Sequence, residues 1–256
     1  MMANAEFFRN NGYLTGLQVF DAENGGHLVA VYERLRSLLP FGEPTERMDW
    51  WHVRDKELWD ICTHSRILDL VEEILGPDFF LWGSQYFCKD PGDSKTVPWH
   101  QDAFYWPLSP QHSITVWLAV MDVDEENAAM RILPRTHKTQ LSHAPTRQNT
   151  DVLESGVDIC TIDESTAVSM VLKSGQISIH DDRLAHGSGP NTSTRPRLGL
   201  AMRFSAGNVK CDMDVWPFFR AYWCRGHDHW RHNPIGIPPS TDMIEFENIT
   251  PRTGER

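Results

Sequence analysis

The stretch SITVWLAVMDV, residues 113–123, is typical of a buried β-strand. It consists mostly of β-branched, aromatic and other apolar residues, which favour the pleated surface of a sheet. The run is too short to cross a bilayer, which requires about 20 apolar residues in a helix. The turn-forming segment DEEN follows directly at 124–127. This stretch therefore predicts one strand of a β-rich core.

Further runs on both sides of this strand have the same character and are separated by turn-forming residues. They are FFLWGSQYFCKD (79–90), AAMRILP (128–134), AVSMVLKSGQISIH (167–180) and RLGLAMRFSA (197–206). Successive short strands without long helices between them favour an antiparallel sandwich or barrel. Before residue 79, apolar residues recur with a helical period instead, in 21–40 and 56–76. The predicted fold class is mainly β with flanking helices.

The chain of 256 residues is expected to form one domain, 1–256, because it has no repeat, low-complexity tract or long linker. Within it we expect a helical layer over about 1–78 and a β core over about 79–207. An aromatic, proline-rich extension, 208–256, shows no clear pattern of secondary structure.

Composition limits the possible partners. A formal net charge of −11 argues against binding to nucleic acid or to an anionic membrane surface. The five cysteines are scattered without a C-x-x-C pair, which is typical of a reduced protein. No apolar run of signal-peptide length lies near the N-terminus. We therefore expect a cytoplasmic protein with a small-molecule substrate, whereas the sequence does not indicate an oligomeric state.

The segment VPWHQDAFYW, residues 97–106, places His100 and Asp102 two positions apart among aromatic rings. In an extended strand both side chains point to the same face. An imidazole and a carboxylate are two members of the facial triad of two histidines and one carboxylate that binds iron. By itself the pair is a weak signal, because a structural role for such residues is more common. His186, in an apparent strand-turn-strand segment, is the candidate third ligand.

Arg197 follows His186 by eleven residues and lies on the next predicted strand. A guanidinium can hold a carboxylate through two parallel hydrogen bonds. A keto acid that chelates a metal at one end still has a free carboxylate at the other. Arg197 is therefore a candidate to bind that carboxylate, and Ser188 could donate a further hydrogen bond to it.

The chain resembles the phytanoyl-CoA dioxygenase-like branch of the iron(II)- and 2-oxoglutarate-dependent oxygenases over most of residues 5–207. The matching stretches are FRNNGYL (8–14), WHQD (99–102), ITVWLAVMDVDEENAAMRILPRTHK (114–138) and HGSGPNTSTRPRLGLAMRF (186–204). The spacing of the His-x-Asp pair, the LP-x-THK segment and the later histidine and arginine makes this resemblance specific. It implies a double-stranded β-helix, a flattened antiparallel barrel flanked by helices.

The resemblance also implies the roles of individual residues. His100, Asp102 and His186 would bind Fe(II). Arg197 and Ser188 would hold the distal carboxylate of 2-oxoglutarate, and O2 would be the oxidant. The positions of two more residues match those of further co-substrate contacts in the family, namely Trp117 and Gln85.

The activity implied by the resemblance is hydroxylation of a C–H bond in a small polar or amphiphilic metabolite, with release of succinate and CO2. Halogenating relatives have Gly or Ala at the position of Asp102, so its carboxylate favours a hydroxylase. Alternatives with the same cofactors are desaturation, cyclisation or epoxidation of a natural product. A different class of function is a non-catalytic β-barrel binding protein. A zinc hydrolase on these ligands would lack an obvious general base.

Four residues are candidates for substrate binding. Tyr105 and Trp106 could form part of an aromatic cage for a cationic group, or could belong to the core. His52 and Arg54, in MDWWHVRDKELW, could anchor an acidic group.

Several other polar residues compete with the proposed site. The cluster of His227, His229 and His232 around Asp228 resembles a metal site, but a solvated loop is the better interpretation. The group of His180, Asp181 and Asp182 is better explained as a polar turn. Arg195 competes with Arg197 for the co-substrate, and Arg203 either faces the cavity or pairs with surface acids.

Overall fold

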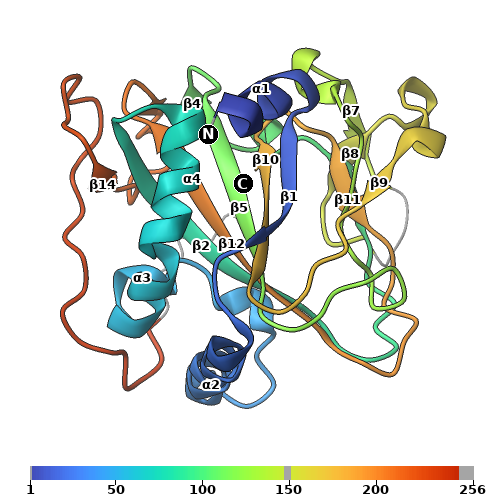
Figure 1. The fold of residues 1–256 in the computed structure, drawn as a ribbon, viewed down its shortest axis with the longest axis horizontal. Coiled ribbons are helices and arrows are strands. Elements are labelled where there is room, and N and C mark those ends of the chain that lie inside the picture. The colour runs from blue at the N-terminus through green and yellow to red at the C-terminus, as the bar shows by residue number, and fades with distance from the viewer. Residues whose placement is uncertain (1, 147–150, 248–256) are drawn as a thin grey trace.

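A six-stranded antiparallel sheet lies at the centre of the structure, a computed structural model that describes residues 2–146 and 151–247 (Figure 1). Its strands, in spatial order, are β1 (Tyr13–Gln18), β10 (Gln176–Asp181), β5 (Ser113–Ala119), β12 (Arg197–Ala206), β2 (Phe79–Lys89) and β14 (Tyr222–Arg225). The order of the strands in the sheet differs from their order in the chain, as in barrels built by crossovers. Every residue of β5 is buried, in agreement with the strand predicted from residues 113–123.

A second, smaller sheet and two short strand pairs complete the β structure. The strands of the second sheet are β3 (Val97–His100), β11 (His186–Ser188), β6 (Arg131–Ile132) and β9 (Val168–Ser169). The short pairs are β4 (Leu108–Ser109) with β13 (Lys210–Cys211), and β7 (His143–Pro145) with β8 (Ser155–Val157). Figure 1 shows β7, β8, β9 and β11 together on one side of the six-stranded sheet.

The helices lie mostly on the other side of the six-stranded sheet (Figure 1). They are α1 (Met2–Asn11), α2 (Ala22–Leu38), α3 (Lys56–Cys62) and α4 (Ser65–Leu75). Short 3-10 helices occupy Thr45–Arg47, Trp51–Val53, Asp102–Phe104, Thr136–Lys138, Ile159–Thr161 and Glu164–Thr166.

Side chains of β5 point alternately to the two faces of the six-stranded sheet. Val116 and Leu118 belong to the main apolar cluster, together with Leu35 of α2 and Ile67 of α4. Thr115 and Trp117 alternate with them and line a cavity on the opposite face. One face of the sheet therefore carries the core beneath the helices, and the other is available for a site.

The structure differs from the sequence-based expectation in three places. The helical run 56–76 is divided, because α3 ends at Cys62 and the side chain of His64 caps α4 by accepting a hydrogen bond from the backbone of Arg66. The N-terminal layer also contains strand β1, which pairs with β10. The C-terminal extension contributes β14, which pairs with β2. Local periodicity did not indicate the strands at either end, because their pairing partners lie far away in the chain.

Gly199 on β12 makes room for the indole of Trp117. Gly199 pairs with Ala119 in the neighbouring strand, and a Cβ atom at this position would lie 1.9 Å from Cζ2 of Trp117. Such a distance is far below van der Waals contact. The glycine is therefore required for the packing of an aromatic ring that lines the cavity.

Replacement of Gly199 by alanine should displace this indole. We expect a loss of about 1–3 kcal/mol in the free energy of unfolding, as for other overpacked cores. Urea denaturation followed by circular dichroism measures this loss. Gly189→Ala is the matched control, because no atom lies within 4 Å of a Cβ built at Gly189. Equal stability of the two variants would contradict the role assigned to Gly199.

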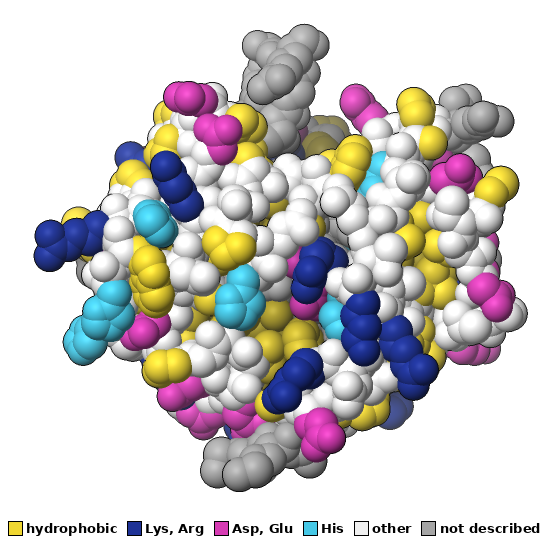
Figure 2. All heavy atoms as spheres, turned by 90° about the horizontal axis from the view of Figure 1, so that it is seen from above, with side chains coloured by type: hydrophobic (Ala, Val, Ile, Leu, Met, Phe, Trp, Pro, Cys, Tyr) yellow, Lys and Arg dark blue, Asp and Glu magenta, His cyan; other side chains and the backbone are white. Residues whose placement is uncertain are grey.

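The chain has a formal net charge of −11. Figure 2 shows a face on which lysine and arginine side chains gather beside a patch of hydrophobic side chains near the middle. In the part of the chain that the structure describes, no helix combines the length and the apolar character needed to cross a bilayer.

Candidate metal centre

Three polar side chains from two distant parts of the sequence meet at one end of the second sheet. His100 is the last residue of β3, and Asp102 begins the 3-10 helix that follows it. His186 is the first residue of β11 and is directly opposite His100 in the antiparallel register. Strand pairing therefore explains why residues so far apart in the chain are neighbours.

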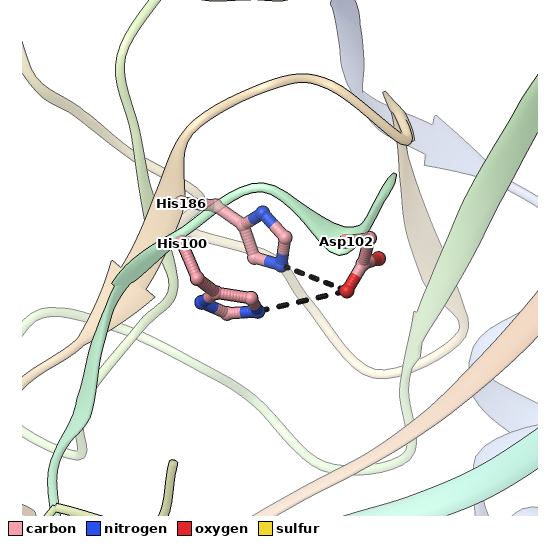
Figure 3. A group of neighbouring side chains, drawn as sticks. All are labelled: His100, Asp102 and His186. Atoms are coloured by element: carbon pink, nitrogen blue, oxygen red, sulfur yellow. Dashed lines mark ion pairs between the residues drawn. The ribbon is translucent and has the colours of Figure 1, made fainter. Parts of the chain in front are cut away.

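The donor atoms of these three residues converge (Figure 3). Asp102 Oδ1 lies 3.6 Å from His100 Nε2 and 3.9 Å from His186 Nε2. One ligand atom from each residue lies within 4.8 Å of the other two. Among residues 2–146 and 151–247, these three side chains form the group of His, Cys, Asp or Glu residues that could hold a metal ion. The predicted third ligand is thus placed beside the predicted pair.

Backbone carbonyls orient both imidazoles. Nδ1 of His100 lies 2.9 Å from the carbonyl oxygen of Pro98, and Nδ1 of His186 lies 2.9 Å from that of Leu184. Because a carbonyl oxygen can only accept, Nδ1 of each ring must carry the hydrogen. Nε2 of each ring is then the nitrogen that faces Asp102 and could bind a metal.

Burial and mutual contact set the charges of the group. Burial tends to raise the pKa of Asp102, but His186, His100 and His180 together lower it well below its usual range. Burial, with the neighbouring His100 and His180, lowers the pKa of His186 well below its usual value. At neutral pH the carboxylate is therefore ionised and the His186 imidazole is neutral. Both groups are in the protonation state required of metal ligands.

Two side chains of the six-stranded sheet contact the second carboxylate oxygen of Asp102. Thr115 Oγ1 donates a hydrogen bond of 3.0 Å to Oδ2, and His180 Nε2 lies 3.7 Å from the same atom. Thr115 and His180 are opposite each other on β5 and β10. This arrangement leaves Oδ1 directed at the two histidines.

Loss of the threonine hydroxyl should weaken metal binding. Thr115→Val keeps the shape of the side chain but removes the donor to Asp102. We expect the affinity of the metal-free protein for Mn(II), measured by calorimetry, to fall about tenfold, the lower end of the range for groups that orient a ligand. Thr192→Val, at an exposed threonine, should leave the affinity unchanged. An unchanged affinity in Thr115→Val would contradict a role in orienting Asp102.

A cavity opens beside this group and contains about 600 Å³ of space free of atoms, including its mouth. All three candidate ligands line it, as do Arg197 and Ser188. Trp117 lines the same cavity, so the structure brings six of the eleven predicted site residues together.

Arg197 and Ser188 have unsatisfied polar atoms in this cavity. Arg197 is only 4% exposed, and its NH1 donates to the carbonyl oxygen of Ala128 at 2.9 Å. Its Nε and the Ser188 hydroxyl are buried without a hydrogen-bond partner. Burial lowers the pKa of Arg197 to about 10, so the side chain remains a cation at neutral pH. A buried cation with unused donors fits an anionic ligand, since uncompensated burial is costly.

Arg195, the competing arginine, lies outside this site. It is exposed and forms an ion pair with Asp124 at 2.7 Å. Although only Pro196 separates the two arginines in the sequence, Arg197 lines the cavity and Arg195 does not. The preference for Arg197 agrees with this placement.

Two predicted residues lie close to the site without lining the cavity. Gln85 accepts a hydrogen bond from Arg203 and donates one to the carbonyl oxygen of Glu46, so its amide is already used. Tyr105 packs its ring 6.0 Å from that of His100, but its hydroxyl donates to the carbonyl oxygen of Ser155. Both side chains therefore have polar partners within the protein.

Three predicted substrate residues do not line this cavity. Trp106 packs edge-on against Trp82, with the ring centroids 4.8 Å apart. His52 is completely buried under the sheet, and its Nδ1 lies 2.8 Å from the Ser84 hydroxyl. Arg54 is exposed and forms a 3.0 Å ion pair with Glu247. His52 is therefore in the core and Arg54 at the surface. Trp106 is partly buried and also lies 5.8 Å from the guanidinium of Arg203, which lines the cavity.

The other competing groups do not join the candidate ligands. Asp181 accepts a hydrogen bond from the backbone of Arg183, and Asp182 accepts one from the backbone of Ser113. His227 and His229 are exposed, with ring centroids 6.0 Å apart. His180, by contrast, belongs to strand β10 and lines the cavity rather than forming a turn.

Sequence reasoning missed Thr115 and left Arg203 undecided. Both line the cavity. The signal for each was alternation along a strand, because Thr115 precedes Trp117 by two residues and Arg203 follows Arg197 by six. An even spacing from a cavity residue indicates the same face of the sheet.

Comparisons with known proteins agree with this geometry. The sequence model of the family "Phytanoyl-CoA dioxygenase (PhyH)" matches residues 10–199. The peroxisomal phytanoyl-CoA dioxygenase of Bos taurus is 32% identical over 164 residues, which cover 60% of this chain and 48% of the bovine protein. A probable alpha-ketoglutarate-dependent hypophosphite dioxygenase of Stutzerimonas stutzeri is 27% identical over 190 residues, which cover 69% of this chain and 61% of that protein. The chain therefore spans about half to three fifths of the length of these relatives.

Solved structures share the fold. The non-heme monooxygenase ThoJ, in its apo form, superposes with a TM-score of 0.80 and 27% sequence identity over 93% of this chain and 89% of ThoJ. The predicted mainly β fold with a double-stranded β-helix core is confirmed by this likeness and by the strand order. Because the family match extends over most of the chain, this protein belongs to the phytanoyl-CoA dioxygenase (PhyH) family of iron- and 2-oxoglutarate-dependent oxygenases.

Proposed function

We propose that this protein is an Fe(II)- and 2-oxoglutarate-dependent dioxygenase that hydroxylates a C–H bond of a small polar or amphiphilic metabolite. The observation that carries the proposal is the convergence of His100, Asp102 and His186 on one point of a cavity that also contains Arg197. When bound, the iron supplies the redox chemistry in which O2 and the keto acid yield succinate, CO2 and a hydroxylated substrate.

The three candidate ligands fit Fe(II). Two imidazoles and one carboxylate form the donor set of non-heme iron oxygenases, which leaves coordination positions open for other ligands. His100 and His186 would each bind through Nε2, since Nδ1 is used by a backbone carbonyl. Asp102 would bind through Oδ1, because Thr115 holds Oδ2. The presence of Asp102 supports hydroxylation rather than halogenation.

Arg197 and Ser188 fit a co-substrate with two carboxylates. Their unpaired Nε and hydroxyl lie in the cavity shared with the candidate ligands. Arg197 would hold the distal carboxylate of 2-oxoglutarate and fix its orientation relative to the metal group. The indole of Trp117 would exclude water from one wall. The relative from Stutzerimonas stutzeri, whose name includes alpha-ketoglutarate dependence, supports the same assignment.

The proposal treats residues 1–256 as one domain. Its support is a continuous apolar cluster that includes Phe8 of α1, Val116 of the sheet and Met243 of the C-terminal extension. A small-molecule substrate and a cytoplasmic location are also part of the proposal.

Anaerobic addition of Fe(II) and 2-oxoglutarate to the metal-free protein tests the proposed function. We expect a weak visible charge-transfer band, which appears only when both are present. In air, the same mixture should slowly convert 2-oxoglutarate to succinate. Addition of metabolites then identifies the substrate as the compound that accelerates succinate release, and mass spectrometry of the product distinguishes hydroxylation from desaturation, cyclisation or epoxidation.

The outcomes separate the classes of function. Asp102→Ala should weaken the band or alter its shape, and Arg195→Gln, at an exposed arginine, should not. Absence of both the band and succinate from the intact protein would contradict the proposal and favour a non-catalytic binding protein.

A further inference from the structure

A second arginine, which is partly buried, lines the candidate active-site cavity. Arg203 lies on β12 six residues after Arg197, and both side chains line the cavity. At a rise of about 3.3 Å per residue, the two positions are about 20 Å apart along the strand. The inward-facing residues between them are Gly199 and Ala201, which are small. The cavity therefore has a cation near each end.

The strand register places Arg203 near the candidate metal ligands. Arg203 is directly opposite Thr115 in the pairing of β12 with β5. Thr115 in turn donates the hydrogen bond to Asp102. The Cβ atoms of residues paired in this way are about 4.5–5.5 Å apart. Arg203 is thus next to the residue that holds Asp102, whereas Arg197 lies at the opposite end of the cavity.

Aromatic rings and an amide hold the Arg203 guanidinium in place. It lies 5.9 Å from the ring centroid of Trp82 and 5.8 Å from that of Trp106. Its NH2 donates to Gln85 Oε1 at 3.0 Å. Two indoles and a side-chain amide restrict its motion, so little entropy remains to be lost when the group binds a ligand.

The charge of Arg203 is only loosely balanced by the protein. In the described part of the chain, the carboxylate recorded in an ion pair with it is Asp49, whose Oδ1 lies 3.8 Å from NH1. This separation is too long for a hydrogen bond. Arg203 Nε is buried without a hydrogen-bond partner. The guanidinium therefore retains donor capacity towards the cavity, as Arg197 does.

The walls of the cavity between the two arginines are largely apolar. Phe87, Trp117 and Met130 line the same space. A ligand that contacted these walls and also Arg203 would have an apolar body and one anionic end. Arg197 and Ser188 are at the far end, so the co-substrate and this ligand would not compete for the same arginine.

We propose that Arg203 binds a carboxylate group of the substrate, so that this enzyme acts on an organic acid with an apolar body. The inference rests on the proposed oxygenase function and adds the substrate class to it. The acid is held by its carboxylate at Arg203 while a C–H bond of its body lies near the candidate metal group.

A screen of matched compounds tests this assignment. Each carboxylic acid is paired with its primary amide, and each is added to the iron-loaded protein with 2-oxoglutarate. We expect acids to accelerate succinate release and their amides not to do so. For the best acid, Arg203→Gln should raise KM about 10- to 100-fold, the equivalent of one hydrogen bond between charged groups. Arg203→Lys, which keeps the charge, should recover part of the loss.

Two further variants keep the result interpretable. Asp49→Asn combined with Arg203→Gln removes both members of the loose ion pair, so a folding defect caused by an unbalanced Asp49 is avoided, and the same rise in KM is expected. Arg195→Gln is the matched control at an exposed arginine and should leave KM unchanged. In all these variants, KM for 2-oxoglutarate should stay within about twofold of the original value, because Arg203 is remote from Arg197.

Several outcomes would overturn the assignment. Amides as effective as acids, or no acid that accelerates succinate release from a protein with the charge-transfer band, would exclude an acid-binding role. An unchanged KM for the acid in Arg203→Gln would also exclude an acid-binding role for Arg203. A raised KM for 2-oxoglutarate instead would show that Arg203 holds the co-substrate. If the intact protein shows neither band nor succinate, the proposed function itself fails, and this inference fails with it.

Discussion

Replacement of His186 by alanine is expected to abolish iron binding and, with it, 2-oxoglutarate turnover. His186 would supply one of the three donor atoms, and its Nε2 is already directed at Asp102 at 3.9 Å. Removal of a ligand should reduce the affinity by more than the 10- to 100-fold typical for residues that merely orient a ligand. Calorimetric titration of the metal-free protein with Mn(II), followed by a succinate assay with Fe(II), measures both effects.

Two controls separate metal loss from misfolding. His186→Gln keeps most of the side-chain volume and should also lose the metal, while circular dichroism should show an intact fold. His229→Ala removes an exposed histidine outside the site and should bind Mn(II) normally. Retained tight binding in both His186 variants would show that this side chain is not a ligand, and the proposed metal centre would have to be abandoned.

Arg197→Gln is expected to cause the second large loss, in co-substrate binding. Arg197 is buried, and the hydrogen bonds between its guanidinium and a carboxylate would carry full charge on both sides. We expect the Kd for 2-oxoglutarate to rise about 10- to 100-fold or more, while the affinity for Mn(II) changes little. The charge-transfer band, titrated anaerobically with 2-oxoglutarate, reports the Kd directly.

Comparison with other arginines locates the effect. Arg195 is only two positions from Arg197, but its side chain is exposed and pairs with Asp124. The Kd of Arg195→Gln for 2-oxoglutarate should therefore equal that of the original protein. Arg197→Lys keeps a positive charge without the planar fork and should give an intermediate Kd. An unchanged Kd in Arg197→Gln would contradict the assignment of this arginine to the co-substrate.

The strongest sequence-based predictions depended on local pattern. The run 113–123, predicted to be a strand from its β-branched and aromatic residues, contains β5. The spacing of His100 and Asp102 indicated a shared site before their partner was placed beside them. Family resemblance added the expected role of His186 and Arg197, which spacing alone had suggested only as candidates.

The weaker predictions relied on the type of a residue and could not take its tertiary contacts into account. Trp106 is predicted to form part of an aromatic cage and His52 to anchor an acidic group, yet His52 is buried against Ser84 and Trp106 packs against Trp82. Gln85 was expected at the co-substrate, but its amide is bound by Arg203. A side chain's partners come from other strands, so the local sequence does not specify them.

By itself, the sequence determined the mainly β class, the candidate metal ligands and the arginine expected to hold a keto acid, because these depend on residue type, spacing and alternation. The tertiary structure alone decided that β3 and β11 pair with His100 opposite His186. It also decided that Thr115 holds Asp102, and that Arg203 faces the cavity rather than the surface. The physical reason is that strand register and packing arise from contacts between distant parts of the chain, and these contacts determine which polar atoms are satisfied and which remain available to a ligand.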